Sequence, residues 1–248
     1  MSSSQQLTIC YLYPDLMNTY GDRGNVLALQ QRISWRGIEA TVLYHSLGDK
    51  LETGKTDIYI FGGGQDRAQI AVSHDLQQKK NELKQDIENG VAALAICGGF
   101  QLFGNYYLDP HGVEIKGIGI FDLITKASDK RMIGNLLVTT TGCMAGTTLI
   151  GFENHSGQTI LADNTPAFAA VEKGFGNNGE DKTEGAIYKN AIGTYMHGSL
   201  LPKNPKLTDY IIQKALERKY GPTTISPLDD TLETQAFAEA NTRFNNNT

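Results

Sequence analysis

The sequence has no excess of positive charge and no long apolar run, and each of these absences excludes a class of protein. Its 248 residues carry a formal net charge of −5. This charge argues against a general nucleic-acid binder, because such proteins normally present a basic face. No apolar stretch approaches the roughly 20 residues that a membrane-spanning helix needs. Residues 1–6 carry no basic group and precede no long apolar run, so we expect no signal peptide.

Cysteine is also scarce. The three cysteines, Cys10, Cys97 and Cys143, lie far apart in the sequence. This spacing fits neither a disulfide framework nor a cluster of metal ligands, so we predict no metal site. Because a free thiol persists in a reducing compartment, the sequence predicts a cytoplasmic protein.

The hydrophobic pattern predicts an α/β protein with a mostly parallel sheet flanked by helices. Predicted strands alternate with predicted helices, which is typical of a parallel sheet with covered faces. The expected strands are 7–13, 39–44, 58–61 and 91–96, and the expected helices are 25–35, 74–89 and 204–220. From 113 to 195 the pattern is β-rich, with segments at 131–138 and 167–171.

The length fits one large α/β domain with an appendage. We expect a single domain over 1–222 and a C-terminal tail over 223–248 that is partly helical or disordered. The tail contains a helical pattern at 228–244, and its last four residues, 245–248, are expected to fray.

Cys97 lies between a predicted buried strand and an amphipathic segment, 100–108, within the run Ile-Cys-Gly-Gly-Phe-Gln at 96–101. A cysteine followed by two glycines at such a junction has the shape of a nucleophile elbow, which exposes a side chain at the C-terminal edge of a sheet. A helix N-terminus behind the sulfur is expected to lower the pKa of the thiol. We therefore predict that Cys97 is a nucleophile with a strained backbone and a φ above zero, rather than a buried structural cysteine.

A thiolate nucleophile needs a general base, and five histidines are available. His45, His74 and His111 occupy positions typical of surface or capping residues. His155 and His197 each follow an apolar β segment and are flanked by turn formers, which predicts a place at a sheet edge. Sequence position alone does not choose between these two.

A glycine run at 62–64 follows the predicted strand 58–61. In a parallel sheet this loop emerges at the same edge as the elbow. Its bare backbone N–H groups, with the N–H of Gly98, are candidates for an oxyanion hole. A phosphate-binding loop is the alternative, but no Lys-Ser or Lys-Thr pair follows the glycines.

Residues 48–56 look like a second phosphate-binding loop. They have one residue too many between the glycines, and a predicted strand rather than a helix follows. The chain therefore shows no ATP site of its own.

Together these motifs resemble those of class I glutamine amidotransferases. Within this class, 96–101, Phe-Glu-Asn-His-Ser-Gly at 152–157 and Gly-Thr-Tyr-Met-His-Gly at 193–198 look like the cobyric-acid-synthase type. The opening 13–25, Tyr-Pro-Asp-Leu-Met-Asn-Thr-Tyr-Gly-Asp-Arg-Gly-Asn, and Phe-Gly-Gly-Gly-Gln-Asp at 61–66 are similar to the stand-alone glutaminase subunits of lipid II isoglutaminyl synthases. The likeness covers about residues 7–220 and implies a flavodoxin-like sheet.

The resemblance implies catalytic roles for the matching residues. Cys97 would attack the side-chain amide of glutamine and form a glutamyl thioester. His197 would be the base, and then the acid that releases ammonia. Gly98 and Gly64 would donate N–H groups to the oxyanion, and Gly63 would lie in the same substrate-binding loop.

The resemblance also implies substrate contacts and shows two departures. Gln101 would line the glutamine site, and Arg131 would bind the substrate α-carboxylate as a bidentate fork. Ala95 replaces a glycine that many class members have. Ser199 stands where many have a glutamate that orients the imidazole, although the cobyric-acid-synthase type commonly lacks it. An acid from elsewhere in the chain or from a partner would then fix the imidazole.

The implied function is a glutaminase subunit of a heterodimeric ligase in peptidoglycan biosynthesis. It would deliver ammonia to a Mur-ligase-like synthetase that amidates D-glutamate in the stem peptide of membrane-bound lipid II. ATP and magnesium are expected on that partner, and no cofactor is expected in this chain.

Three alternatives stand beside this reading. One is a glutaminase for another synthetase, such as one that amidates a corrinoid. A second is a cysteine peptidase on a similar scaffold, against which Arg131 and Gln101 argue, because free glutamine needs such tethers. A third is an inactive binding subunit, against which the intact pair Cys97 and His197 argues.

Overall fold

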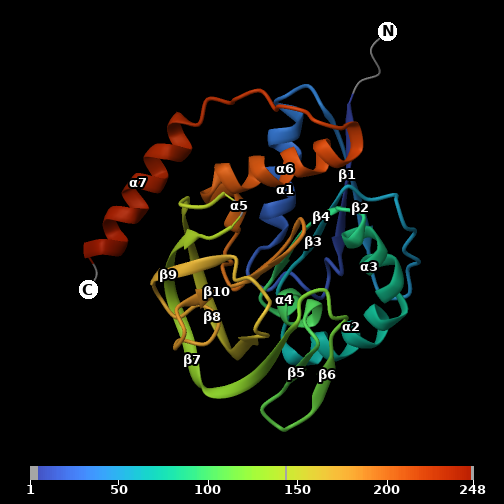
Figure 1. The fold of residues 1–248 in the computed structure, drawn as a ribbon, viewed down its shortest axis with the longest axis vertical. Helices are drawn as coiled ribbons and strands as arrows, with labels where there is room; N and C mark the ends of the chain where they lie inside the picture. Colours follow the sequence, from blue (N-terminus) through green and yellow to red (C-terminus); the bar gives the residue numbers. More distant parts are fainter. Residues whose placement is uncertain (1–4, 143, 247–248) are drawn as a thin grey trace.

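The computed structural model describes residues 5–142 and 144–246, so Cys143 and the chain ends lie outside the described residues. Its centre is a six-stranded sheet in the order β11-β12-β4-β3-β1-β2 (Figure 1). Five of these strands run parallel, and β11 pairs with β12 as an antiparallel edge. The strands are β1 (Gln6–Leu12), β2 (Glu39–His45), β3 (Ile58–Phe61), β4 (Ala92–Ile96), β11 (Ala186–Tyr188) and β12 (Ala191–Thr194).

The expected parallel α/β sheet is confirmed, and all four predicted strands are present. Every residue of β3 and β4 is buried, as a parallel sheet covered on both faces requires. The order β2-β1-β3-β4-β12 is the flavodoxin-like one, in which the order reverses between β1 and β3. Ligands of such sheets bind outside the carboxyl ends of the strands at this reversal.

Two loops meet at that reversal. The loop after β1 donates the Thr19 N–H to the Gly63 carbonyl at 3.0 Å. In return, the Gly63 N–H donates to Asp22 Oδ2 at 2.8 Å. The glycine loop after β3 is therefore held against the loop after β1 by two hydrogen bonds.

Helices cover the sheet in two groups. The first group packs together, and its α6 contacts β3 and β4; it consists of α1 (Arg23–Ser34), α5 (Leu200–Lys203) and α6 (Pro205–Tyr220). In the second group α4 contacts β4 and β12, and α2 contacts both α3 and α4; it consists of α2 (Asp66–Gln78), α3 (Lys80–Glu88) and α4 (Gly98–Phe103). Right-handed crossovers on either side of the reversal place such groups on opposite faces.

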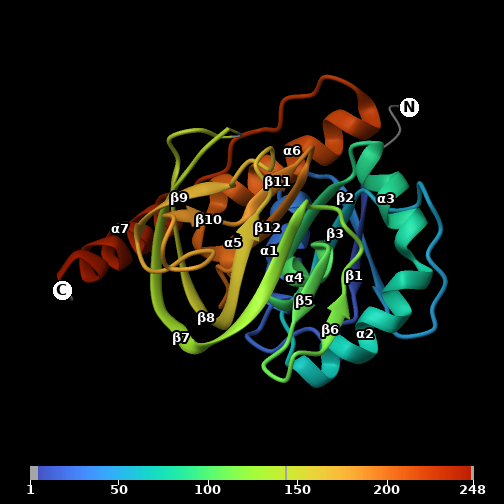
Figure 2. The ribbon, with the colours of Figure 1, turned by 60° about the horizontal axis from the view of Figure 1, so that its bottom comes forward.

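A second, mostly antiparallel sheet forms the β-rich part of the chain (Figure 2). Its core is the long hairpin of β7 (Leu123–Thr140) and β8 (Thr148–Leu161), whose register shifts between Ala127 and Met132. A bridge between Phe152 and His197 links β8 to the segment after β12. The other strands are β5 (Tyr106–Leu108), β6 (Glu114–Lys116), β9 (Ala169–Lys173) and β10 (Thr183–Glu184).

Two sequence predictions of helix boundaries are wrong. The helix expected at 74–89 is in fact α2 and α3, which break at Lys79, and α2 begins at Asp66 directly after the glycine loop. The amphipathic segment 100–108 is helical only to Phe103, because Gly104 adopts an extended conformation and β5 follows. The second error arises from a contact between distant residues, since β5 pairs with β7.

The tail is helical and anchored. Helix α7 (Thr231–Asn246) contacts α5 and β8, and it lies at the side of the molecule opposite α3 in both views (Figures 1 and 2). Before it, Asp230 forms an ion pair with the buried Arg32, which also pairs with Asp209. The Arg36 side chain donates to the Ser226 carbonyl at 2.8 Å. The domain boundary at 222 stays a prediction.

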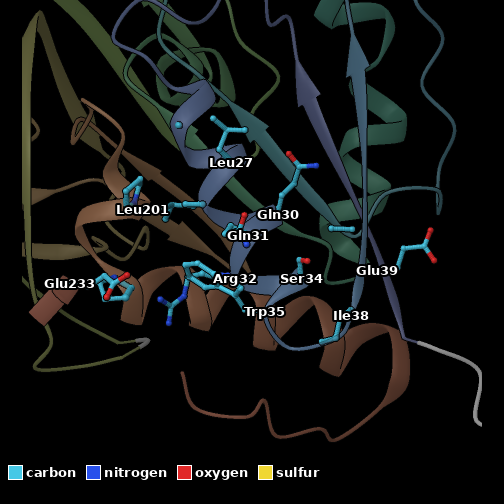
Figure 3. A pocket seen from close by; sticks show the side chains of 15 residues that line it. Leu27, Gln30, Gln31, Arg32, Ser34, Trp35, Ile38, Glu39, Leu201 and Glu233 are labelled. Carbon is cyan, nitrogen blue, oxygen red and sulfur yellow. The ribbon is translucent and has the colours of Figure 1, made fainter. Parts of the chain in front are cut away.

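A cavity of about 950 Å³ lies between α1, α5 and the start of α7. Figure 3 shows Leu27, Gln31, Trp35 and Glu233 among its lining residues. Cys97 does not line this cavity.

In the part of the chain that is described, no helix is long and apolar enough to cross a membrane.

We expect Arg32→Ala to lower the free energy of unfolding by about 1–3 kcal/mol, because it leaves two partly buried carboxylates without their guanidinium. Asp230→Ala removes only the tail contact, so it should cost less stability but speed proteolytic cleavage of the tail. Urea denaturation and limited trypsin digestion measure the two effects. Equal losses of stability in Arg32→Ala and Asp230→Ala would contradict the expectation that Asp230 contributes only to anchoring the tail.

Candidate active site

Cys97 has the predicted elbow conformation. Its φ is 50° and its ψ is −107°, a strained combination for a residue with a Cβ. The Cys97 N–H donates to the Thr194 carbonyl of β12 at 2.8 Å, and the Gly99 N–H donates to the Gly62 carbonyl at 3.1 Å. A Cβ on Gly99 would lie 2.5 Å from the Phe61 carbonyl oxygen, so only glycine fits there. The turn after β4 is therefore fixed by both neighbouring strands.

The glycine loop lies directly beside the elbow. A Cβ on Gly98 would lie 3.0 Å from the Gly64 nitrogen, and one on Gly63 would lie 3.3 Å from Cys97 Cβ. Since the Gly63 N–H already donates to Asp22, it is not free to bind an oxyanion. Gly64 and Gly98 lie side by side next to the sulfur, and their role as oxyanion donors stays a prediction.

The surroundings of Cys97 favour the neutral thiol over the thiolate. Burial raises its pKa to about 12, and the Asp22 carboxylate adds to the increase, while the Gly98 N–H and Arg131 oppose it. The first N–H of helix α4, that of Gly98, lowers this pKa as expected, but burial of the thiol outweighs it and the net direction is upward.

The sequence analysis assigned no role to Asp22, although this residue lies inside the motif at 13–25. Its side chain is fully buried, and burial raises the pKa of its carboxyl to about 6. One oxygen binds Gly63, and the other, Oδ1, has no hydrogen-bond partner among the described residues. The sequence signal was its place after β1, at the same sheet edge as the glycine loop.

A cavity of about 300 Å³ opens at the Cys97 sulfur. It brings together four residues predicted for the site: Gly64, Cys97, Gln101 and Arg131. The Gln101 amide donates to the Tyr195 hydroxyl at 3.1 Å, and its carbonyl oxygen has no partner in the described chain. The Arg131 Nε donates to Asn154 Oδ1 at 2.7 Å, which fixes its guanidinium. The cavity is also lined by Thr19, Tyr20, Gln65, Asp66, Gln69, Tyr107, Asn154, His155, Ser156 and Gly157.

The two candidate histidines lie in different cavities. His155 lines the cavity of Cys97, stacks on the Tyr195 ring at 3.6 Å, and its Nδ1 is 2.8 Å from the Gly157 carbonyl. His197 lines a neighbouring cavity of about 510 Å³. Tyr20 lines both cavities and stacks on the His197 ring, with centroids 4.1 Å apart and planes at 15°. Tyr20 therefore stands at the boundary between the two.

The His197 ring is buried and uncharged. Burial lowers its pKa to about 4, with further lowering by His155 and slight opposition from the Asn154 backbone. Among the described residues no carboxylate hydrogen-bonds the ring, so none fixes its tautomer. Ser199 does not substitute for one, because its hydroxyl donates to the Gly21 carbonyl at 2.7 Å.

This arrangement suits acyl transfer from an amide. A cysteine at an elbow, the Gly64 loop and a fixed guanidinium meet in one cavity of small-ligand size, and Gly98 lies next to Gly64. A neutral imidazole, which is the form that accepts a proton, lies next to it.

Comparison with known proteins agrees with the geometry. Residues 8–205 match the family described as the CobB/CobQ-like glutamine amidotransferase domain. The chain is 41% identical over 233 residues to the GatD subunit of lipid II isoglutaminyl synthase (glutamine-hydrolyzing) from Staphylococcus aureus, covering 93% of each chain. It is 40% identical to the same subunit from Streptococcus pneumoniae, covering 94% of this chain and 90% of the other. A solved glutamine amidotransferase shares the fold, with a TM-score of 0.57 at 13% identity, covering 83% of this chain and 98% of that one.

We expect iodoacetamide to alkylate Cys97 slowly at pH 7 and about tenfold faster per pH unit up to pH 10, because the thiolate fraction rises until the pKa is reached. Asp22→Asn should shift this profile to lower pH, since it removes a carboxylate that raises the pKa of the thiol. Site-resolved mass spectrometry separates Cys97 from the other cysteines. A plateau between pH 6 and 8 in the wild-type chain would instead reveal a thiolate–imidazolium pair.

Proposed function

Because the chain belongs to the CobB/CobQ-like glutamine amidotransferase family, we propose that it is the glutamine-hydrolysing subunit of a lipid II isoglutaminyl synthase. It hydrolyses L-glutamine and delivers ammonia for the amidation of D-glutamate in the lipid II stem peptide. The observation that carries this proposal is the contact between the Cys97 elbow and the Gly64 loop, in a cavity that also contains Arg131.

The proposed reaction begins with binding of the substrate carboxylate by Arg131. His197 accepts the proton of the Cys97 thiol as the sulfur attacks the side-chain amide carbon. The N–H groups of Gly64 and Gly98 stabilise the oxyanion of the tetrahedral intermediate. The imidazolium then protonates the leaving nitrogen, and ammonia departs. Water hydrolyses the remaining thioester to glutamate and regenerates the thiol.

The proposed proton transfer between Cys97 and His197 involves Tyr20, which lines the cavities of both residues. Tyr20 and His197 are stacked, and the loop that carries Tyr20 is held to the glycine loop through the Thr19 N–H. Rearrangement of this loop on binding of glutamine or of a partner would bring the imidazole and thiol together. Such rearrangement is a common step in assembling an active site.

The synthetase partner is proposed to be Mur-ligase-like and to form a heterodimer with this chain. ATP and magnesium belong to that partner, since residues 48–56 lead into strand β3 rather than into a helix that would receive phosphate. The partner also offers a source for the acid that His197 lacks. A carboxylate on the imidazole fixes its tautomer, and loss of such a group costs about 10⁴ in rate.

In the complex with the synthetase, Cys97→Ala should abolish amidation that uses glutamine but leave amidation that uses ammonium chloride intact. Only ammonia generation depends on the thiolate. Cys10→Ala, which changes the buried cysteine of β1, is the matched control and should support both reactions. Loss of the ammonium-driven reaction in Cys97→Ala would assign Cys97 a structural role.

His197→Gln should lower kcat for glutamine by at least about 10²-fold, because an amide cannot accept the proton that a general base removes. His155→Gln should lower kcat far less, since His155 is stacked on Tyr195 and its Nδ1 is engaged by Gly157. Steady-state kinetics of the two variants in the complex rank the two histidines. The reverse ranking would identify His155 as the base.

A further inference from the structure

We propose that Asp66 binds the α-ammonium group of the glutamine substrate, across the cavity from Arg131. This inference rests on the proposed function. It states how the site would recognise its substrate, a free α-amino acid that carries both an ammonium and a carboxylate group. Neither the family motifs nor the comparisons give Asp66 a role.

The first turn of α2 places Asp66 at the cavity. Helix α2 begins at Asp66 after Gln65, which adopts an extended conformation, so the chain turns directly from the glycine loop into the helix. Asp66 and Gln69, three residues apart, share one face of the helix and both line the cavity. Gln69 is buried and donates to the Gly64 carbonyl at 3.1 Å, which ties this turn to the glycine loop. Asp66 is exposed, so its carboxylate is accessible to a ligand in the cavity that it lines.

Arg131 comes from a different part of the molecule. It lies at the irregular segment of β7, and its Nε is fixed by Asn154 of β8. No ion pair joins Asp66 to Arg131, or either residue to another charge, within residues 5–142 and 144–246. Two opposite charges therefore line one cavity without forming an ion pair. The Tyr107 hydroxyl, which lines the same cavity, donates to the Asp66 carboxylate, and the other lone pairs of that carboxylate can accept from a ligand.

The charges in the cavity match those of a free amino acid. Among its described lining residues, Asp66 is the one carboxylate and Arg131 the one guanidinium. Glutamine carries one ammonium and one carboxylate on its α-carbon, and its side-chain amide must reach Cys97. A carboxylate stabilises an ammonium and a guanidinium stabilises a carboxylate through charge-assisted hydrogen bonds. Binding of the pair fixes the α-carbon and so the direction of the side chain.

A second acceptor lies beside Asp66. The carbonyl oxygen of the buried Gln69 has no hydrogen-bond partner in the described chain, and Gln69 lines the same cavity. An unpaired buried acceptor is costly, so a ligand N–H that binds it gains more than it would at an exposed site. The first turn of α2 therefore presents a carboxylate and an unpaired carbonyl to a group rich in N–H donors.

Asp66 also has an ordinary structural explanation, because acidic residues in the first turn stabilise a helix through its dipole. The two roles make different predictions. If Asp66 only stabilises the helix, its substitution should lower the stability of the protein and change kcat/KM equally for all substrates. A residue that binds the ammonium affects only substrates that have one.

The test uses the complex with its synthetase and compares L-glutamine with glutaramate, which is glutamine without its amino group. Asp66→Asn should raise KM for L-glutamine by about tenfold or more, with a smaller change in kcat, because a hydrogen bond to a charged group is lost. The same variant should leave kcat/KM for glutaramate unchanged. Asp66→Glu, which keeps the charge, should restore much of the preference for L-glutamine. Asp129→Asn removes an exposed carboxylate outside the cavity and is the matched control.

Covalent labelling gives a readout that does not depend on turnover. Asp66→Asn should slow labelling of Cys97 by 6-diazo-5-oxo-L-norleucine, an amino-acid electrophile, but not by iodoacetamide. Equal effects of Asp66→Asn on L-glutamine and glutaramate, or unchanged kinetics with both, would overturn the role of Asp66 alone. If the wild-type complex neither hydrolyses L-glutamine nor reacts with the amino-acid electrophile, the proposed function fails, and this inference fails with it.

Discussion

The hydrogen bond from the Gly63 N–H to Asp22 is the contact on which the arrangement of the site depends. It joins the loops after β1 and β3 at the point where the strand order reverses, and it sets the Gly64 N–H beside Gly98. The bond has an electrostatic cost. A buried carboxylate with one unpaired oxygen has a raised pKa and raises the pKa of the Cys97 thiol nearby. The same carboxylate therefore positions the glycine loop and disfavours the thiolate form of Cys97.

Burial also determines the protonation of the two candidate catalytic side chains. The Cys97 thiol and the His197 imidazole are each held in the neutral form, and Tyr20 stands between their cavities. Because the thiolate is the nucleophilic form, a neutral Cys97 thiol reacts slowly with electrophiles.

The local features of this fold could be predicted from the sequence, and the contacts between distant segments could not. Apolar runs identify β1, β3 and β4, and two glycines after Cys97 identify the elbow, because both signals lie within a few residues. The start of α2 at Asp66 was missed, since a glycine run before it looks like the middle of a loop. The engagement of Gly63 by Asp22 and the stacking of Tyr20 on His197 join residues about 40 and 180 positions apart. No local pattern encodes them. The family resemblance, not spacing, brought Arg131 and His197 into the predicted site, and their roles there stay predictions.

Ser199 packs closely against the start of α1. A Cβ on Gly24 would lie 2.8 Å from the Ser199 Cβ, and Ser199 itself has a φ of 54°. The glycine at 24 allows this close approach, and the Ser199 hydroxyl donates to the Gly21 carbonyl at 2.7 Å just before α1. Position 199 therefore joins the segment that follows β12 to the start of α1, so a substitution there would also disturb the placement of His197, two residues earlier in the chain.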